Sequence, residues 1–200
     1  MRILLADPNR DLLSSYQALL EKNDHTVRIA FDGARVLTLL GESAFDFAIV
    51  NERLPRIRHD RVIRNLHDAE IPVLVLLDRP LTRKILLRRE LANAYLSFPF
   101  SPEELFTVME DVRKKAAETL DVMGVFVSGF RFTGTDIRLT AGEVDVLRKL
   151  SNGERLTGGG YGVWVYSLNW KLERLPEKQR VQIAYTARNG YGLARGGETS

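Results

Sequence analysis

The sequence predicts an α/β protein: a (βα)5 part that carries a parallel sheet, followed by a smaller α+β part. Three observations support this predicted fold class. Short, nearly all-apolar runs alternate with amphipathic segments through residues 1–117, as expected for parallel strands that are buried on both faces of a sheet. A short stretch at 118–124 lacks this pattern and is typical of a linker. Residues 125–200 contain alternating segments punctuated by glycine, two helical segments and a hairpin pattern.

The first part contains five apolar runs, which predict strands at residues 3–6, 25–30, 45–50, 71–77 and 94–98. Apolar residues at helical spacing predict helices between them, at residues 10–22, 34–40, 60–67 and 81–91. A last helix is expected to begin at Ser101. Pro102 suits the first helical position, and Glu104 lies three residues after the serine, which is the spacing of a capping box.

The second part changes in character. Residues 125–139 alternate between apolar and polar, which predicts short antiparallel strands. Thr140 and Glu143 have the spacing of a capping box and open a helix, and a second helix is expected over residues 163–175. Residues 181–194 predict a hairpin, because two strand-like runs flank an Asn-Gly pair at or near the turn.

Composition and charge narrow the class of protein. The chain has 200 residues, 44% of them apolar, and no cysteine, which excludes disulfides and thiol chemistry. The first apolar run is too short for a signal peptide, and no run approaches the roughly 20 residues that cross a membrane. We therefore expect a cytoplasmic protein without a membrane partner. Residues 1–120 hold 18 basic and 18 acidic side chains, and residues 121–200 hold 11 and 8, so the surplus lies in the second part and is compatible with a polyanionic partner.

The first 117 residues resemble the receiver domain of bacterial response regulators, which has a flavodoxin-like fold. Four features carry the resemblance. They are the strand–helix order, the opening ILLADPNR, the loop ERLP after the third strand, and AYLSFPFSPEEL near the end. In that family an acidic pair after the first strand binds Mg²⁺, and an aspartate after the third accepts a phosphoryl group. A Thr or Ser ends the fourth strand, and a Lys precedes the proline after the fifth.

The phosphorylation site that the resemblance implies is degenerate here. The five matching positions hold, in chain order, Asp7, Pro8, Asn51, Leu77 and Phe98. An amide cannot replace the carboxylate that attacks phosphorus, and a single acid is half of a metal site. We therefore predict a pseudo-receiver with apolar packing at this site and with no catalytic residue, metal or other cofactor. Asp7 is expected to be a surface or capping acid.

The resemblance also implies a switch residue and a dimer face. Tyr95 falls at the family's switch-aromatic position. The dimer face joins basic and acidic side chains of two helices across a two-fold axis, and its candidates are Arg83, Lys84, Arg88, Glu110 and Asp111. The alternative is that the basic helix is an ordinary solvated one.

The second part resembles, more loosely, the winged-helix effector domain of the OmpR/PhoB type. The resemblance rests on IRLTAGEVDVLRKL, on VYSLNWKLERL at the recognition-helix position and on NGYGLA in the wing hairpin. The family's middle helix is expected after Leu156, where this chain has three glycines, a poor helical sequence. The span between the two helices is about ten residues short.

If the second helix enters a DNA groove, its exposed polar face and the wing would make the contacts. The candidates are Ser167, Asn169, Lys171, Arg174 and Arg188, with Trp164, Leu168 and Leu172 expected to pack inward. The alternative is that these basic residues form an ordinary solvated face.

The leading hypothesis is a phosphorylation-independent transcriptional regulator that forms a homodimer through its receiver part and binds double-stranded DNA. A second hypothesis is a protein-interaction module that does not bind DNA and contacts the transcription machinery or a signalling protein. A third, a residual phosphoryl-transfer enzyme, is disfavoured because four of the five site positions are changed.

Overall fold

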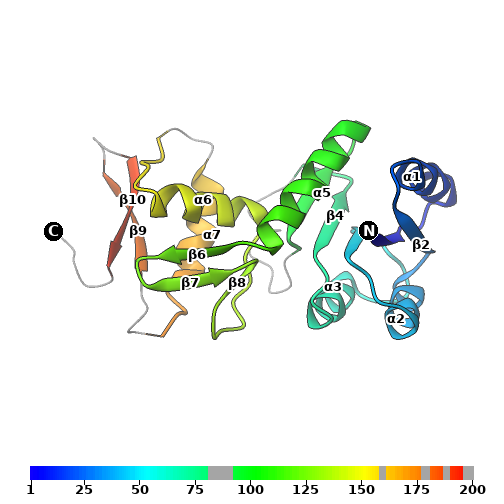
Figure 1. Ribbon diagram of the computed structural model, residues 1–200, viewed down its shortest axis with the longest axis horizontal. Coiled ribbons are helices and arrows are strands. Elements are labelled where there is room, and N and C mark those ends of the chain that lie inside the picture. The colour runs from blue at the N-terminus through cyan, green and yellow to red at the C-terminus, as the bar shows by residue number, and fades with distance from the viewer. Residues whose placement is uncertain (81–91, 158–160, 177–180, 187–189, 196–200) are drawn as a thin grey trace. The chain divides into compact units, whose positions relative to one another are not determined.

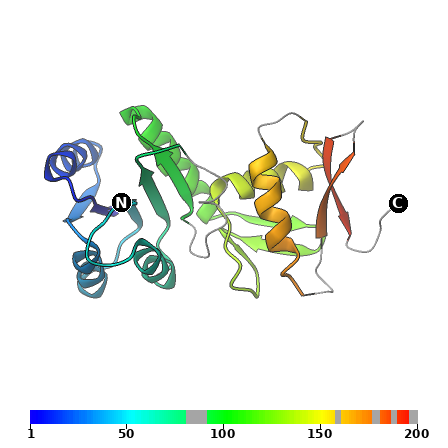
Figure 2. The same cartoon turned by 180° about the vertical axis from the view of Figure 1, so that it is seen from behind.

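The computed structural model describes residues 1–80, 92–157, 161–176, 181–186 and 190–195. The chain divides into two compact units, Met1–Arg113 and Lys114–Ser200, each described by itself below (Figures 1 and 2). No helix among the described residues combines the length and apolar character needed to cross a membrane.

The first unit is built on a five-stranded parallel sheet in the order β2-β1-β3-β4-β5. Its strands are β1 (Arg2–Ala6), β2 (Thr26–Ala30), β3 (Phe47–Asn51), β4 (Val73–Leu77) and β5 (Ala94–Ser97). All five predicted strands and their parallel arrangement are confirmed. β3 runs one residue further than predicted, so its last residue is Asn51. Every residue of β3 and β4 is buried, which explains their nearly uniform apolar sequences.

Helices cover both faces of this sheet. The described helices are α1 (Arg10–Lys22), α2 (Gly33–Glu42), α3 (His59–Asp68) and α5 (Pro102–Ala116). α2 and α3 lie on one face, and α1 and α5 lie on the other (Figures 1 and 2). The capping box predicted at Ser101 is present: Ser101 N–H donates to Glu104 Oε2 and Glu104 N–H donates to Ser101 Oγ. The helix predicted at 81–91 lies outside the described residues.

The second unit begins with a three-stranded antiparallel sheet of β6 (Thr119–Val122), β7 (Val125–Ser128) and β8 (Arg131–Phe132). The prediction of a linker at 118–124 is therefore wrong. Met123 and Gly124 both have positive φ, 55° and 88°, which is the backbone of a tight two-residue hairpin turn. Val122, the residue before this turn, is fully buried. Residues 119–122 therefore form a strand that buries Val122, although their sequence alone gives only a weak strand signal.

Two helices and a hairpin complete the second unit, in the predicted order. They are α6 (Ala141–Ser151), α7 (Gly162–Leu172), β9 (Val181–Thr186) and β10 (Gly190–Arg195). β9 and β10 are antiparallel, and Leu156 bridges the other edge of β10 at Tyr191. The capping box of Thr140 and Glu143 is confirmed at the start of α6. A single apolar core joins the two helices and both sheets.

Helices α6 and α7 approach closely at Gly142. A Cβ atom at this position would lie 2.6 Å from Cε2 of Trp164, so only glycine leaves room for the indole ring. Gly162, at the start of α7, has no such neighbour within 4 Å. The close packing of α6 and α7 therefore requires glycine at position 142 but not at position 162.

We predict that Gly142→Ala destabilises the second unit by about 1–3 kcal/mol, because it overpacks a filled contact. The matched variant Gly162→Ala should be neutral or slightly stabilising, since alanine favours helix over glycine. Denaturant unfolding followed by tryptophan fluorescence measures this, because both tryptophans, Trp164 and Trp170, belong to this unit. Equal unfolding midpoints for the two variants would contradict the prediction.

Candidate functional site

The candidate site of the first unit lies at the carboxyl edge of its sheet. Asp7 follows β1, Asn51 ends β3, Leu77 ends β4 and Phe98 follows β5. Because the strands are parallel, their carboxyl ends lie at the same end of the sheet, where open α/β sheets place their functional groups. β1 and β3 are neighbours, which brings Asp7 and Asn51 together.

A buried hydrogen bond joins the two residues. Asn51 Nδ2 donates to Asp7 Oδ2 at 2.9 Å, and the side chains are only 5% and 1% exposed. The other oxygen of Asp7 accepts the Asn9 N–H at 2.7 Å, and Asn51 Oδ1 accepts the Arg53 N–H at 2.8 Å. These partners fix which end of the amide faces the carboxylate. The prediction of a surface or capping acid is therefore wrong, because Asp7 is buried and the residue that caps α1 is Asn9.

The electrostatics of Asp7 follow from this burial. Desolvation raises the pKa of Asp7 above its ordinary value. Hydrogen bonds from Asn9 and Asn51 act in the opposite direction, and the charge of Asp78 adds to the rise. The carboxylate is therefore held by N–H donors on both oxygens, in an environment that disfavours its charge.

These residues do not fit the Mg²⁺ ion that receiver domains use. Magnesium prefers oxygen ligands, and Asn51 turns its nitrogen, not its oxygen, toward Asp7. Within the described ranges, no group of three or more histidine, aspartate or glutamate side chains could hold a metal ion. The amide thus places an N–H donor, and not a ligand oxygen, beside the Asp7 carboxylate.

Apolar and aromatic side chains hold the remaining positions. Leu77 is buried in the core, and Pro8 is exposed. The Phe98 ring lies 4.7 Å from that of Phe100, which stacks at 5.8 Å on Tyr16. Burial, with a contribution from the charge of Asp7, raises the pKa of the Tyr16 hydroxyl. The aromatic cluster was not predicted beyond Phe98 itself, although the FPF sequence at 98–100 is a visible signal.

In the second unit, α7 is turned differently from the prediction. Ser167 and Lys171 are 1% and 3% exposed, and Asn169 is only partly exposed. The prediction that these three form an exposed reading face is wrong. Trp164, Leu168 and Leu172 pack against the core as expected. Because the exposed face of α7 lies opposite Leu168, it consists of Val163, Tyr166 and Trp170. The exposed residues Glu173 and Arg174 follow just past the end of the helix.

Asn169 acts as a clamp between α7 and β9. Its Oδ1 accepts the Ile183 N–H at 3.0 Å, and its Nδ2 donates to the Ile183 carbonyl at 3.1 Å. One side chain thereby satisfies both backbone groups of a strand residue. This role accounts for an amide at a position where the sequence predicted a DNA contact.

Lys171 is half of a buried ion pair. Its Nζ lies 2.5 Å from Oε2 of Glu143, which is fully buried and also accepts the Thr140 N–H of the capping box. Burial lowers the pKa of Lys171, and the negative charge of Glu143 opposes that shift. The lysine therefore belongs to the core and is unavailable to a nucleic acid.

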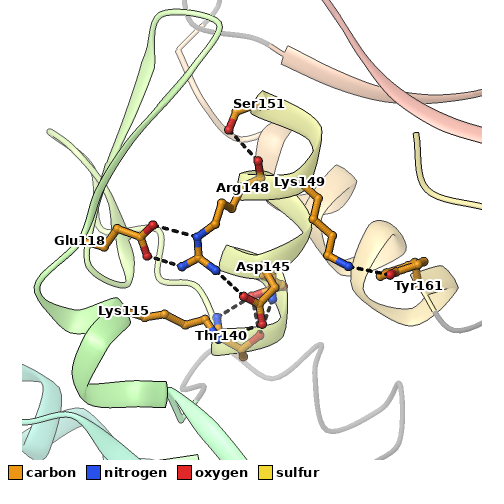
Figure 3. Close-up of polar contacts among 9 residues, drawn as sticks. Lys115, Glu118, Thr140, Asp145, Arg148, Lys149, Ser151 and Tyr161 are labelled. Atoms are coloured by element: carbon orange, nitrogen blue, oxygen red, sulfur yellow. Dashed lines mark hydrogen bonds and ion pairs between the residues drawn. The ribbon is translucent and has the colours of Figure 1, made fainter. Parts of the chain in front are cut away.

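The outer side of α6 carries a second set of ion pairs (Figure 3). Arg148 lies between Glu118 and Asp145 and pairs with both, and Asp145 also accepts from the buried Lys115 Nζ at 2.8 Å. The Arg148 hydrogen bond lowers the pKa of Glu118. Lys149 Nζ donates to the Tyr161 hydroxyl at 2.9 Å. The basic residues of α6 are thus engaged within the unit.

Comparisons with known proteins give relatives and fold neighbours, although no family model matches. The response regulator MprA of Mycobacterium avium is 27% identical over 158 residues, which is 78% of this chain and 65% of that protein. MprA of Mycobacterium ulcerans is 29% identical over 118 residues, 58% of this chain and 51% of that protein. The chain thus spans between half and two thirds of the length of these relatives.

Solved structures resemble the first unit. The receiver domain of a Francisella response regulator covers 57% of this chain and 97% of its own length, with a TM-score of 0.51 and 24% identity. A receiver domain from Clostridium thermocellum covers 57% and 94%, with a TM-score of 0.52 and 20% identity. The chain is a relative of two-component response regulators. Its first unit has the receiver fold, as predicted.

The predicted switch residue, Tyr95, and the acidic half of the predicted dimer face, Glu110 and Asp111, lie within the described residues. The Tyr95 hydroxyl accepts the Ala92 N–H at 3.1 Å, and its ring packs partly buried against the core. Glu110 pairs with Arg113 at 2.7 Å on the same helix, and Asp111 is partly exposed. The basic half of the predicted dimer face, Arg83, Lys84 and Arg88, lies outside the described residues, as does the wing residue Arg188. The dimer face stays a prediction.

We predict that Asp7 makes the stability of the first unit fall as pH rises. Its folded-state pKa lies above the ordinary value of 3.8, so the stability that Asp7 contributes is fully present below that value and is lost as pH rises through the folded pKa. Asp7→Asn removes this titration. The stability of the variant relative to the natural chain should therefore improve from about pH 4 toward pH 7. Denaturant unfolding followed by circular dichroism measures it.

Asp46 supplies a control of opposite sign. The Arg2 N–H holds the pKa of Asp46 below 3.8, so its stabilisation is present above that value and is lost as pH falls through the lowered pKa. Relative to the natural chain, Asp46→Asn should therefore become less stable as pH rises through the lowered pKa of Asp46. Parallel pH curves for Asp7→Asn and Asp46→Asn would exclude the assigned environment of Asp7.

Proposed function

We propose that the chain is a response-regulator-like signalling protein whose receiver unit works without an aspartyl phosphate. One observation carries the proposal: Asn51, at the end of β3, donates a buried hydrogen bond to Asp7. The amide lacks the nucleophilic oxygen for phosphoryl transfer, and the remaining acid is occupied by N–H donors. Any input to this unit is then a binding event rather than phosphorylation.

The neighbouring substitutions support the same conclusion. Receiver chemistry needs a hydroxyl and an ammonium group on the phosphoryl oxygens, and this edge offers Leu77 and Phe98 instead. Leu77 is 2% exposed, and Phe98 belongs to an aromatic cluster. Restoring the carboxylate alone would leave a developing phosphoryl charge facing apolar side chains, which is unfavourable.

For the second unit, an atypical winged helix by its element order, we infer an output through protein contact. The inference is supported by the exposed face of α7, where Val163, Tyr166 and Trp170 lie, because tryptophan, tyrosine and arginine dominate protein interfaces. The transcription machinery and signalling proteins are the partner classes proposed.

Duplex DNA binding is the second candidate output. It is supported by the positive surplus of the second part and by the relatives named response regulators. Two of the five DNA-contact candidates remain for it, Arg174 and Arg188. Arg174 is exposed and its guanidinium lies 4.7 Å from the Trp170 ring centroid.

The first test of the proposal is chemical. Incubation with acetyl phosphate and Mg²⁺ should give no covalent adduct, and neither acetyl phosphate nor beryllofluoride with Mg²⁺ should change the oligomeric state. Asn51→Asp should remain unmodified too. It should also lose about 1–3 kcal/mol of unfolding free energy at neutral pH, because a donor to a buried carboxylate is replaced by a like charge. A receiver domain with a complete acidic site serves as the positive control. An adduct on the natural chain would refute the proposal.

A salt titration separates the two outputs. Binding to duplex DNA through several phosphates weakens steeply as salt increases. With protein contact as the output, we expect no duplex binding even near 50 mM salt. Salt-sensitive binding that is abolished in Arg174→Ala/Arg188→Ala, but retained in Arg113→Ala in the other unit, would establish the DNA-binding output instead.

A further inference from the structure

The carboxylate of Asp7 is buried among hydrogen-bond donors that carry no charge. One oxygen accepts the Asn9 N–H at 2.7 Å, the other accepts Asn51 Nδ2 at 2.9 Å, and the side chain is 1% exposed. In the part of the chain that the structure describes, no basic side chain acts on this carboxylate as a counter-ion. A buried charge without a counter-ion is costly, and such a group favours its neutral form.

The charged groups of the neighbouring elements do not compensate this charge. Asp78, directly after β4, is itself a carboxylate and raises the pKa of Asp7, and Asp7 in turn raises the pKa of the Tyr16 hydroxyl on α1. The start of α1 and the ends of β2 and β3 carry Arg10, Asp11, Asp32, Glu52 and Arg53. The two cations among them are engaged elsewhere, because Arg53 Nε pairs with Asp78 Oδ2 at 2.7 Å and Arg10 lies over the Phe31 ring.

A proton on Asp7 would place a donor where the carboxylate now accepts. A neutral carboxylic acid carries an O–H, which needs an acceptor when it is buried. Both groups that bond to Asp7, Asn9 N–H and Asn51 Nδ2, are donors. The acceptor within this network is Asn51 Oδ1, which now faces the Arg53 N–H at 2.8 Å. Asn51 can present that oxygen to Asp7 only if its amide turns over, and the Arg53 N–H then loses its acceptor.

Arg53 connects this site to the loop after β4. Its backbone N–H bonds to Asn51, and its side chain pairs with Asp78. The backbone of Asp78 is held as well, because its N–H donates to Glu52 Oε1 at 3.0 Å. A continuous set of hydrogen bonds and one ion pair therefore runs from Asp7, through the loop after β3, to the loop after β4.

We propose that a proton is the input of the first unit, and that its uptake by Asp7 turns the Asn51 amide and releases the backbone N–H of Arg53. The inference rests on the proposed function, since it names the binding event that replaces phosphorylation. The proton adds to a carboxylate oxygen of Asp7, and an O–H···O bond to Asn51 Oδ1 replaces the N–H···O bond, so no other reactant is needed. Because burial raises the pKa of Asp7, the change occurs as pH falls through a value above 3.8.

A pH titration of the full chain by NMR tests the proposal. The carboxyl carbon of Asp7 reports its protonation, and the backbone amide of Arg53 reports the loop. Both signals should titrate with one midpoint, above 3.8. Hydrogen exchange of the Arg53 amide, corrected for the intrinsic effect of pH, should become about tenfold faster below that midpoint, because one hydrogen bond is lost. An Arg53 amide that does not follow Asp7 would overturn the proposal.

Ile49 provides the internal control against acid unfolding. It lies in the middle of β3 and is 1% exposed. Its amide should stay protected throughout the titration while that of Arg53 changes. If both amides lose protection at the same pH, the response is ordinary unfolding and the proposal is overturned.

Asp7→Asn imitates the protonated form at neutral pH. Whichever way its amide is placed, asparagine cannot accept from both the Asn9 N–H and Asn51 Nδ2, so Asn51 must turn. The Arg53 amide of this variant should therefore exchange at the fast rate, and that rate, corrected in the same way, should no longer depend on pH. Asp46→Asn is the matched control: Asp46 accepts the Arg2 N–H at 2.7 Å, and its loss should leave Arg53 unchanged. Slow exchange of Arg53 in Asp7→Asn, or equally fast exchange in Asp46→Asn, would contradict the turn of the amide.

The titration and the phosphorylation test fail separately. A covalent adduct with acetyl phosphate would refute the proposed function whatever the titration shows. A chain that forms no adduct and whose Arg53 amide does not respond to the protonation of Asp7 would leave the proposed function standing and would overturn the proton as its input.

Discussion

The hydrogen bond from the buried amide of Asn51 to the buried carboxylate of Asp7 joins the carboxyl ends of two neighbouring strands, β1 and β3, in the first unit. Asn51 and Asp7 stand where a receiver domain would hold a phosphoacceptor and a metal ligand, and their hydrogen bond is satisfied without either. Removing one partner would leave a buried polar atom of the other, Asp7 Oδ2 or Asn51 Nδ2, without this hydrogen bond, which costs more than the bond itself contributes. The pair is therefore stable as an amide and an acid, and Leu77 and Phe98 hold two further positions at the same end of the sheet.

The second unit depends in a similar way on Glu143. This fully buried glutamate closes the capping box of α6 and accepts the ammonium group of Lys171 on α7. A buried ion pair contributes little net stability, but breaking it leaves an uncompensated charge in the core. The rotation of α7 is accordingly constrained from two sides, by Glu143 and by the Asn169 clamp on β9. That rotation is what leaves Tyr166 and Trp170 exposed.

The sequence was sufficient for the first unit and only partly so for the second. Apolar strands and amphipathic helices alternate clearly in residues 1–80, and the ends of parallel strands then bring Asp7 and Asn51 together. The burial of Asp7 was missed because an acid after a strand has no local signal for its partner 44 residues away. The face of α7 was misassigned because apolar residues occur all around it, from Val163 to Leu172, so periodicity does not single out the buried side. β6 was missed because its register depends on pairing with β7.

The Asn169 clamp has a consequence for how the chain behaves in a crowded solution. Strand β9, VQIAYT, has no charge, proline or glycine, and its outer edge would present unpaired backbone groups to any other chain. In an antiparallel ladder alternate residues face outward, and Ile183, at the middle of that edge, is the residue whose N–H and C=O the Asn169 side chain occupies. A single amide on a neighbouring helix thus shields a sequence that is otherwise suited to fibril-like stacking.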